Sequence, residues 1–265
     1  MDESQGTPHL QLVPGLASTA SWRVPPKTLV LRRDEVHVWR ANLNVTAAHE
    51  RLLREALSQE ELRRASRFHF QRDRERFVVA RGVLRAILAR YVAREPGQLR
   101  FCYGPYGKPV LNPECGVNAL RFNSSHSHDL VLCAVTLERA IGVDVEHVRG
   151  GDAEDLARGF FSPQEIAALT ALPPDNRQAA FFACWTRKEA YVKAKGDGFT
   201  MRPDRFSVSC SPGEPAALLD VEGQPEEATR WSLWALNPAP GYVAALAVEG
   251  GSRPLRFWDS GSGPC

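Results

Sequence analysis

The chain lacks the sequence features that mark several common classes of protein. Its 33 basic and 31 acidic residues leave a formal net charge of +2, so bulk electrostatics provide no case for nucleic-acid binding. No segment approaches the roughly 20 apolar residues of a membrane-spanning helix. The acidic N-terminus has no hydrophobic stretch of the kind found in signal peptides. We therefore expect neither nucleic acid nor a membrane as a partner.

Cysteine is scarce and irregularly placed. The six cysteines include no Cys-x-x-Cys pair, and several lie inside apolar runs, as buried free thiols do. This pattern favours a reducing, cytoplasmic setting.

The length of 265 residues and the hydrophobic content of 43% allow one large domain or two small ones. Residues 1–30 carry four prolines among Gly and Ser and show no periodicity, which predicts a poorly ordered leader. The folded part is expected to open with a strand near Glu35–Arg40, where apolar and polar residues alternate.

Two long helices are predicted. Apolar residues recur at helical spacing from about Asp73 to Val92 and from about Arg177 to Lys195, and Gly196 then occupies a C-cap position. Two shorter helices are expected to begin after Ser58 and Ser162, each followed three residues later by a glutamate. Alternating apolar runs predict strands at 131–137, 206–210, 217–221, 231–236 and 242–248.

The stretch Ile141–Glu146 reads as a strand because β-branched residues alternate along it. Residues two apart on a strand point the same way, so Asp144 and Glu146 project from one face. Taken alone, the pair is the solvated face of an ordinary strand. The alternative is a site for a hard cation, because two carboxylates on one face repel each other unless a positive charge lies between them.

Two polar segments precede this strand. Gly107 and Lys108 lie in a turn, where a glycine lets the backbone approach a ligand closely and the lysine adds a charge. The segment Asn123–His128 ends an apolar strand in a polar cluster. His126 and His128 share a strand face, but no third His or Cys is spaced to complete a zinc site. We favour a hydrogen-bonding loop for an anion.

Basic residues gather in a nearly neutral chain. Arg64, Arg67, Arg76 and Arg81 form a local positive excess that suits a polyphosphate ligand, although most arginines of such a helix form its solvated face. On the second long helix, Trp185, Glu189 and Lys193 follow at i+4 steps and share one face. By itself the Glu189–Lys193 pair reads as a surface ion pair. Together with Asp144 and Glu146, Glu189 makes three carboxylates beside basic residues. This is the arrangement for a Mg²⁺ ion that holds a diphosphate.

The chain resembles the Sfp-type 4′-phosphopantetheinyl transferases. The resemblance covers about Glu35 to Val248. It rests on ordered blocks, namely Gly107–Pro109, Asn123–Ser127, Ile141–Glu146, Phe160–Ser162 with Glu165, and Trp185–Lys193 followed by Gly196 and Gly198. The Gly-x-Asp-x-Glu block alone is weak, but its pairing with Trp-x-x-Lys-Glu-Ala-x-x-Lys about 40 residues later is highly specific.

The resemblance implies a reaction and a fold. Members of this family transfer 4′-phosphopantetheine from coenzyme A to a serine hydroxyl of an apo acyl or peptidyl carrier protein, with Mg²⁺, and release 3′,5′-ADP. The implied α+β fold is a pseudo-dimer of two similar halves with the active site in the cleft between them. Here the halves would span residues 31–139 and 140–250, each with a sheet and one long helix, and residues 251–265 would be a flexible tail.

The resemblance also assigns roles to residues. Asp144, Glu146 and Glu189 match the Mg²⁺ ligands, Asp144 being the ligand most firmly expected to bind directly. Glu189 also matches the general base that acts on the carrier serine, directly or through water. Lys193 matches a lysine that holds the α-phosphate, and Asp144 contributes to the coenzyme A site through the metal.

The remaining assignments concern coenzyme A. Gly107 and Lys108 match the adenine and phosphate pocket. The block containing Asn123, Ser125 and His126 matches the segment that grips the 3′-phosphate or diphosphate. The candidates for further phosphate contacts are Arg64 and Arg81. The chain departs from the family pattern at Ser124, where an apolar residue is more common and a small core site is expected.

Two alternative functions stay open at this stage. An enzyme that binds coenzyme A or transfers acyl groups would keep the basic pocket without a metal site. A non-catalytic carrier-binding module would leave the carboxylates as surface charges. We expect a monomer that docks its acidic carrier protein on the segment between His147 and Phe160 and on the helix after Ser162.

Overall fold

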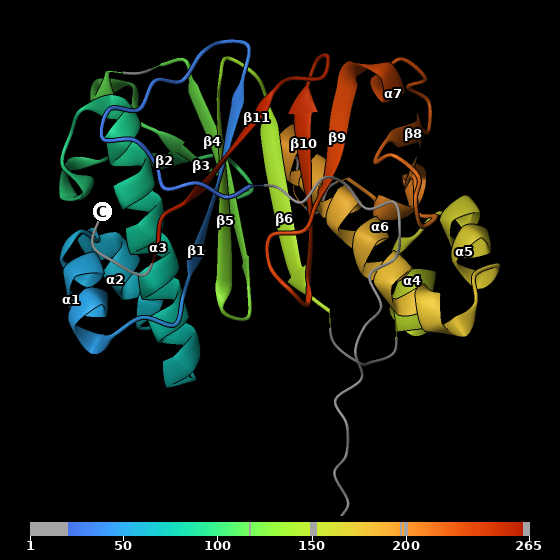
Figure 1. The fold of residues 1–265 in the computed structure, drawn as a ribbon, viewed down its shortest axis with the longest axis horizontal. Coiled ribbons are helices and arrows are strands. Elements are labelled where there is room, and N and C mark those ends of the chain that lie inside the picture. Colours follow the sequence, from blue (N-terminus) through green and yellow to red (C-terminus); the bar gives the residue numbers. More distant parts are fainter. Residues whose placement is uncertain (1–20, 117, 149–152, 197, 199–200, 262–265) are drawn as a thin grey trace, which may run out of the picture.

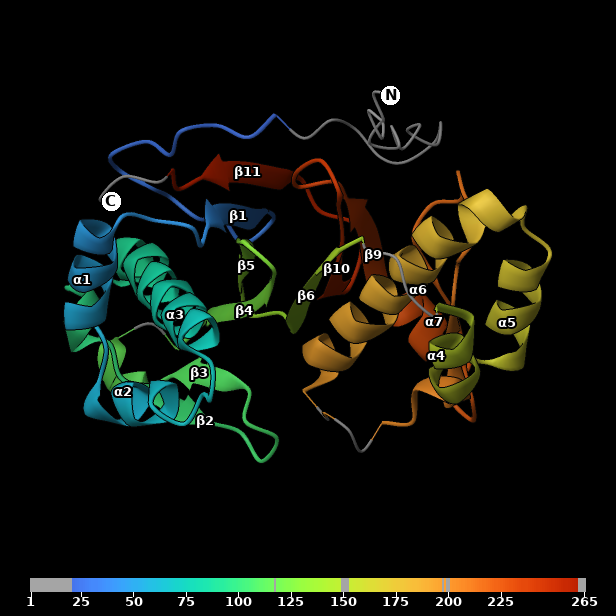
Figure 2. The ribbon, with the colours of Figure 1, turned by 90° about the horizontal axis from the view of Figure 1, so that it is seen from below.

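The computed structural model describes residues 21–116, 118–148, 153–196, 198 and 201–261. Two halves lie side by side along the molecule, each with helices packed on a sheet (Figures 1 and 2). No helix within the described part of the chain is long and apolar enough to cross a membrane.

The N-terminal half consists of a sheet, three helices and a small hairpin. Its elements are β1 (Val36–Asn42), α1 (Ala47–Glu55), α2 (Gln59–Ala65), α3 (Gln71–Val92), the hairpin β2 (Phe101–Tyr103) and β3 (Pro109–Leu111), β4 (Leu120–Ser127) and β5 (Leu130–Leu137). Ser58 caps α2 and forms the predicted capping box with Glu61. The long helix predicted from Asp73 to Val92 is confirmed as α3.

The C-terminal half begins directly after a short turn. Its elements are β6 (Ile141–His147), α4 (Ala153–Phe160), α5 (Pro163–Thr170), α6 (Pro174–Lys195), β7 (Phe206–Val208), β8 (Leu218–Val221), α7 (Glu227–Arg230), β9 (Trp231–Leu236) and β10 (Tyr242–Glu249). Short 3₁₀ turns occupy Pro96–Gln98, Pro113–Cys115 and Pro203–Arg205. The predicted N-cap at Ser162 and the second long helix are confirmed, and Ser162 also forms a capping box with Glu165.

The two halves repeat one topology. In the first, β1 is followed by α3, β4 and β5, and the strands lie in the order β1-β5-β4. In the second, β6 is followed by α6, β9 and β10, and the order is β6-β10-β9. All pairs within these two sets are antiparallel. The pseudo-dimer of two α+β halves is therefore confirmed.

The core has three main parts that follow from the alternation of the strands. One face of the first sheet, with Trp39 and Cys133, packs against α3, and one face of the second sheet, with Ala245, packs against α6. The opposite faces of the two sheets meet in a third cluster that includes Leu132 and Val143. The result is a helix–sheet–sheet–helix arrangement, seen end-on in Figure 2.

The end of the described chain differs from the expected flexible tail. Residues Leu255–Asp259 form β11, which pairs in parallel with β1 and extends the first sheet to four strands. Part of the predicted leader is also ordered, because Arg23 forms a bridge with Trp258 and Trp22 packs edge-on against Phe257. Both departures arise from pairing between segments far apart in the sequence, which local periodicity does not reveal.

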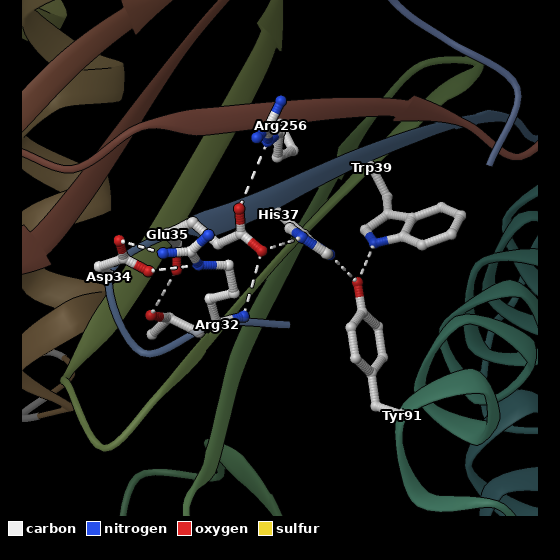
Figure 3. Close-up of polar contacts among 8 residues, drawn as sticks. Arg32, Asp34, Glu35, His37, Trp39, Tyr91 and Arg256 are labelled. Carbon is white, nitrogen blue, oxygen red and sulfur yellow. Dashed lines mark hydrogen bonds and ion pairs between the residues drawn. The ribbon is translucent and has the colours of Figure 1, made fainter. Parts of the chain in front are cut away.

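A buried polar network joins β11 and α3 to β1 (Figure 3). The Tyr91 hydroxyl accepts a hydrogen bond from Trp39 Nε1 at 2.7 Å and contacts His37 Nδ1 at 2.9 Å. His37 Nε2 lies 3.3 Å from Glu35, whose other oxygen accepts from Arg256 of β11. Burial of the ring is the main cause of a lowered pKa for His37, and Glu35 opposes this effect.

Gly142 sets the distance between β6 and α6. A Cβ atom at this position would lie 2.1 Å from the carbonyl oxygen of Ala190 and 2.4 Å from the amide nitrogen of Ala194. No real Cβ makes such contacts, so any side chain would push the helix off the sheet. This close packing places the polar face of α6 directly beside the carboxylates of β6.

Candidate active site

The two halves meet at β4 and β6. Side chains of β4, and not paired backbone groups, make the hydrogen bonds between these two strands described below. Asn123 Oδ1 accepts from the amide of Val143 at 2.9 Å. Ser125 Oγ donates to Asp144 Oδ1 at 2.8 Å. Ser127 repeats the pattern two residues on, because its hydroxyl donates to Glu146 Oε2 at 2.8 Å and accepts from the amide of His147. The alternating polar residues of β4 thereby fix the two carboxylates of β6.

A cavity of about 690 Å³ opens beside this junction and is walled by both halves. The predicted face of α6 lines it, with Trp185, Glu189 and Lys193. The structure brings nearly all of the predicted site residues to this cavity: Gly107, Lys108, Asn123, Ser125, His126, Asp144, Glu146, Glu189 and Lys193. An apolar part of the wall contains Phe160, Trp185, Val192, Met201 and Pro203.

The centre of the cavity is acidic. Asp144 is 3% exposed, and its Oδ1 atom lies 2.5 Å from Lys193 Nζ, which also donates to Ser125 at 2.9 Å. Burial raises the pKa of Glu189, and the negative charges of Asp144 and Glu146 add to this rise, while Lys193 opposes it. One lysine therefore faces three carboxylates, which leaves an excess of negative charge.

The donor set fits a hard cation. The second oxygen of Asp144, Oδ2, is buried and has no hydrogen-bond partner, which is costly unless another group supplies positive charge. The three carboxylates are not packed tightly, however. Within the part of the chain that the structure describes, the one set with three ligand atoms within 4.8 Å is Glu165, Cys184 and Cys210. In that set the carboxylate is already paired with the Lys188 ammonium at 2.6 Å, which disfavours a metal.

The rim of the cavity is basic. The cavity wall limits hydration of His126 and, with the charges of Lys193 and Arg76, lowers the pKa of the ring although it remains accessible. An anion would relieve this crowding of cationic groups. The rejected zinc interpretation gains no support, because His128 stacks on His147 at 4.9 Å between ring centroids and pairs with Asp129.

Two sequence-based expectations, for Ser124 and for Arg81, differ from the geometry. Ser124 lines the cavity rather than a core site. Arg81 does not reach the cavity, because it pairs with the buried carboxylate of Glu61, donates to Tyr103 and lies over Phe101. The cost of leaving the buried Glu61 without its cations holds Arg81 there.

Arg64 and Lys108 lie at the borders of the cavity. Arg64 lines a neighbouring recess that shares Gly107 with it. Lys108 lines the cavity itself, but its ammonium group contacts backbone carbonyls of the other half. Its expected role in the adenine and phosphate pocket stays a prediction.

Sequence reasoning overlooked two residues that organise the site. Ser127 holds Glu146, and its i+2 spacing from Ser125 was the available signal. Lys188, which precedes Glu189, points into the core and bonds both oxygens of Glu165. Adjacent residues on α6, about 100° apart around the helix axis, thus face different surroundings, one the core and one the cavity.

These features define a mixed α/β protein of two similar halves, with a charged cavity between them suited to an enzyme with a polyanionic substrate. Comparison with known proteins identifies the family of enzymes. The family model described as the 4′-phosphopantetheinyl transferase superfamily matches residues 140–247, and the model described as 4′-phosphopantetheinyl transferase, N-terminal, matches residues 43–138.

Curated relatives agree. The chain is 43% identical over 239 residues to the 4′-phosphopantetheinyl transferase HetI of Nostoc sp., covering 90% of this chain and 98% of HetI. It is 31% identical over 152 residues to the 4′-phosphopantetheinyl transferase Sfp of Bacillus subtilis, covering 57% of this chain and 66% of Sfp. A solved structure titled Chronobacterium ammoniagenes ACPS-CoA complex aligns with a TM-score of 0.33 and 22% identity, covering 43% of this chain and 98% of that one.

This chain belongs to the 4′-phosphopantetheinyl transferase family. It is an enzyme that transfers phosphopantetheine from coenzyme A to carrier proteins.

Proposed function

We propose that the cavity between the halves is the active site, and that Mg²⁺ assists transfer of phosphopantetheine to a serine hydroxyl of an apo acyl or peptidyl carrier protein. The observation that carries this proposal is the buried carboxylate of Asp144 with one oxygen unpartnered, beside Glu146 and Glu189. Such an excess of carboxylate charge suits a divalent cation and a diphosphate together.

Asp144, Glu146 and Glu189 would hold the Mg²⁺, with Glu146 bound directly or through water. When bound, the metal supplies positive charge that neutralises the diphosphate oxygens and the leaving 3′,5′-ADP. The raised pKa of Glu189 supports this assignment: burial is its main cause, but the charges of Asp144 and Glu146 add to it, and a cation would remove that repulsion.

The basic side of the cavity would bind coenzyme A. Lys193 supplies a cation for the α-phosphate, and His126 offers a ring donor for a further phosphate. Ser125 acts beside them through Asp144 and Lys193, because its hydroxyl donates to the first and accepts from the second. Asn123 acts indirectly, since its side chain is occupied by the amide of Val143. The backbone at Gly107 would approach the adenine closely.

The transfer step needs a proton acceptor and a charge-stabilised leaving group. The serine oxygen of the carrier forms a bond to the phosphorus that carries pantetheine, and the bond from that phosphorus to the 3′,5′-ADP oxygen breaks. The serine proton passes to the Glu189 carboxylate, directly or through water. Lys193 remains beside the developing charge on the leaving phosphate.

The carrier protein would dock where the cavity has its apolar wall, near Phe160, which is 39% exposed. The predicted docking surfaces are the segment between His147 and Phe160, of which residues 149–152 lie outside the described residues, and helix α5, which begins three residues after Phe160. A monomer is proposed because one chain supplies both walls. A cytoplasmic location fits the five described cysteines, which are all free.

The test incubates the protein with coenzyme A, MgCl₂ and a panel of apo carrier proteins and follows intact mass. We expect a mass increase of one phosphopantetheine that chelator abolishes and added Mg²⁺ restores. Asp144→Asn and Glu189→Gln should each lower the rate by at least about 100-fold, the scale of a lost general base or charge-stabilising group. Asp220→Asn, at an exposed position, is the matched control.

Two outcomes would refute the assignment. Transfer that persists in chelator would exclude the metal. Full activity in both cavity variants would show that these carboxylates are not the catalytic site.

A further inference from the structure

The ammonium group of Lys108 makes three contacts, and all of them cross from the N-terminal half to the C-terminal half. Nζ donates to the carbonyl oxygens of Ile141 at 3.0 Å, Lys193 at 2.6 Å and Ala194 at 3.1 Å. Ile141 is the first residue of β6, and the other two lie in the last turn of α6. A protonated lysine has three hydrogens to donate, so this set can occupy all of them.

The position of this cation follows from helix physics. The last carbonyls of a helix have no partner within it and carry the negative end of the helix dipole. The Val192 carbonyl is capped by the amide of Gly196. The next two carbonyls, of Lys193 and Ala194, are capped by Lys108. If the ammonium moved to a phosphate, both would lose this donor.

A second contact joins the same two segments. Gly198 has a positive φ of 55°, and a Cβ atom there would lie 2.8 Å from the Cβ of Tyr106. The turn that carries Tyr106 and Lys108 therefore packs on the chain just after α6 as well as on its last turn. Both segments line the active-site cavity.

We propose that Lys108 is a positioning residue, a latch between the two halves that holds the last turn of α6, and with it Lys193, against the cavity wall. It acts through backbone carbonyls and does not touch the phosphates. Burial of the ammonium lowers the pKa of Lys108 to about 8, in keeping with a group enclosed by protein. The inference rests on the proposed use of Lys193 in catalysis, but the latch itself exists without substrate.

The latch is tested with Lys108→Met, which keeps the length of the side chain and removes its donors. Lys27→Met is the matched control at an exposed position. Hydrogen exchange is measured on the ligand-free proteins, and kcat, KM and the salt dependence of coenzyme A binding are measured in parallel. Lys108→Arg serves as the conservative variant, because a guanidinium can still donate to two or more carbonyls.

If Lys108 acts as a latch, Lys108→Met should speed amide hydrogen exchange in the last turn of α6 at least tenfold in the ligand-free protein. The value of kcat falls at least tenfold, and the salt dependence of coenzyme A binding stays as in the wild type. Lys108→Arg recovers a large part of both losses, and Lys27→Met changes neither.

Other results would overturn the latch. Unchanged exchange, with weaker coenzyme A binding that depends less on salt, would make Lys108 a direct phosphate ligand. Faster exchange with normal kcat would make its role structural only. Should Lys108→Met fail to fold, Lys108→Gln, whose shorter side chain loses the ammonium, takes its place, and wild-type exchange and kcat in that variant would refute the latch. A wild-type protein inactive on every carrier would refute the proposed function and leave the exchange result standing.

Discussion

Replacing Lys188 with methionine is expected to lower the free energy of unfolding by about 3–5 kcal/mol, because it leaves the buried Glu165 carboxylate without its cation. Lys188 is 2% and Glu165 1% exposed, and Nζ lies 2.7 and 2.6 Å from the two carboxylate oxygens. Methionine fills most of the space but offers no charge. In a chain of this size the loss corresponds to a fall in Tm of about 6–20 °C.

Urea unfolding of four proteins measures the effect: wild type, Lys188→Met, Glu165→Gln and the double variant. Glu165 also accepts hydrogen bonds from the amides of Ser162 and Val208, and glutamine can keep one of these. We therefore expect Glu165→Gln alone to destabilise. The double variant should recover at least half of the loss caused by Lys188→Met, since no buried charge remains.

This reasoning fails if Lys188→Met costs under about 1 kcal/mol, the scale of an exposed pair. It fails equally if the double variant is no more stable than Lys188→Met, because the penalty would then come from packing and not from charge. Lys27→Met, at an exposed position, should leave stability unchanged.

Three further predictions concern the fold and the site. Gly142→Ala should lower the free energy of unfolding by about 3 kcal/mol or more, because the new methyl group overpacks against α6. The control Gly159→Ala adds a methyl group in open space and should be neutral or stabilising. Equal urea midpoints for the two variants would contradict the prediction. In chelator at pH 8, Glu189→Gln should raise Tm, because the raised pKa of Glu189 means that its negative charge destabilises the folded wild type. This gain in Tm should shrink towards pH 4, where the carboxyl group is protonated. A lower Tm in the variant at pH 8 would refute the prediction. The pKa of His37 is lowered in the folded state, so neutral His37 contributes fully to the free energy of unfolding above the unfolded pKa of 6.5, and this contribution is lost as the pH falls below it. The difference in free energy of unfolding between wild type and His37→Asn should therefore narrow from pH 7.5 to 5. A difference that stays constant over this range would refute the prediction.

Local patterns predicted the parts of the fold and site that depend on a single element. Helical periodicity placed both long helices to within a few residues, and the spacing of Ser58 and Glu61 predicted a capping box that the structure confirms. Strand alternation put Asp144 and Glu146 on one face, and they do line one cavity. The meeting of β6 with α6 depended on family resemblance, because sequence spacing does not specify which elements converge.

The contacts that the sequence does not reveal share a physical cause. Sequence shows that Arg81 and Lys108 carry positive charge, but it does not show which acceptor takes that charge. Arg81 is paired with a buried glutamate 20 residues earlier, and Lys108 is bound to carbonyls contributed by two other elements. The sequence therefore locates the cations of this region but not the acceptors with which the folded protein pairs them.

The parallel pairing of β11 with β1 has a consequence for the order in which the enzyme is made. Residues 36–40 leave the ribosome early, but their neighbours at 255–259 follow only after both helix–sheet units have been synthesised. Throughout that interval the edge of β1 beside Glu35 and His37 is uncovered. A chain that lacks residues 255–259 would present an open strand edge in its N-terminal half, of the kind that favours pairing with another chain.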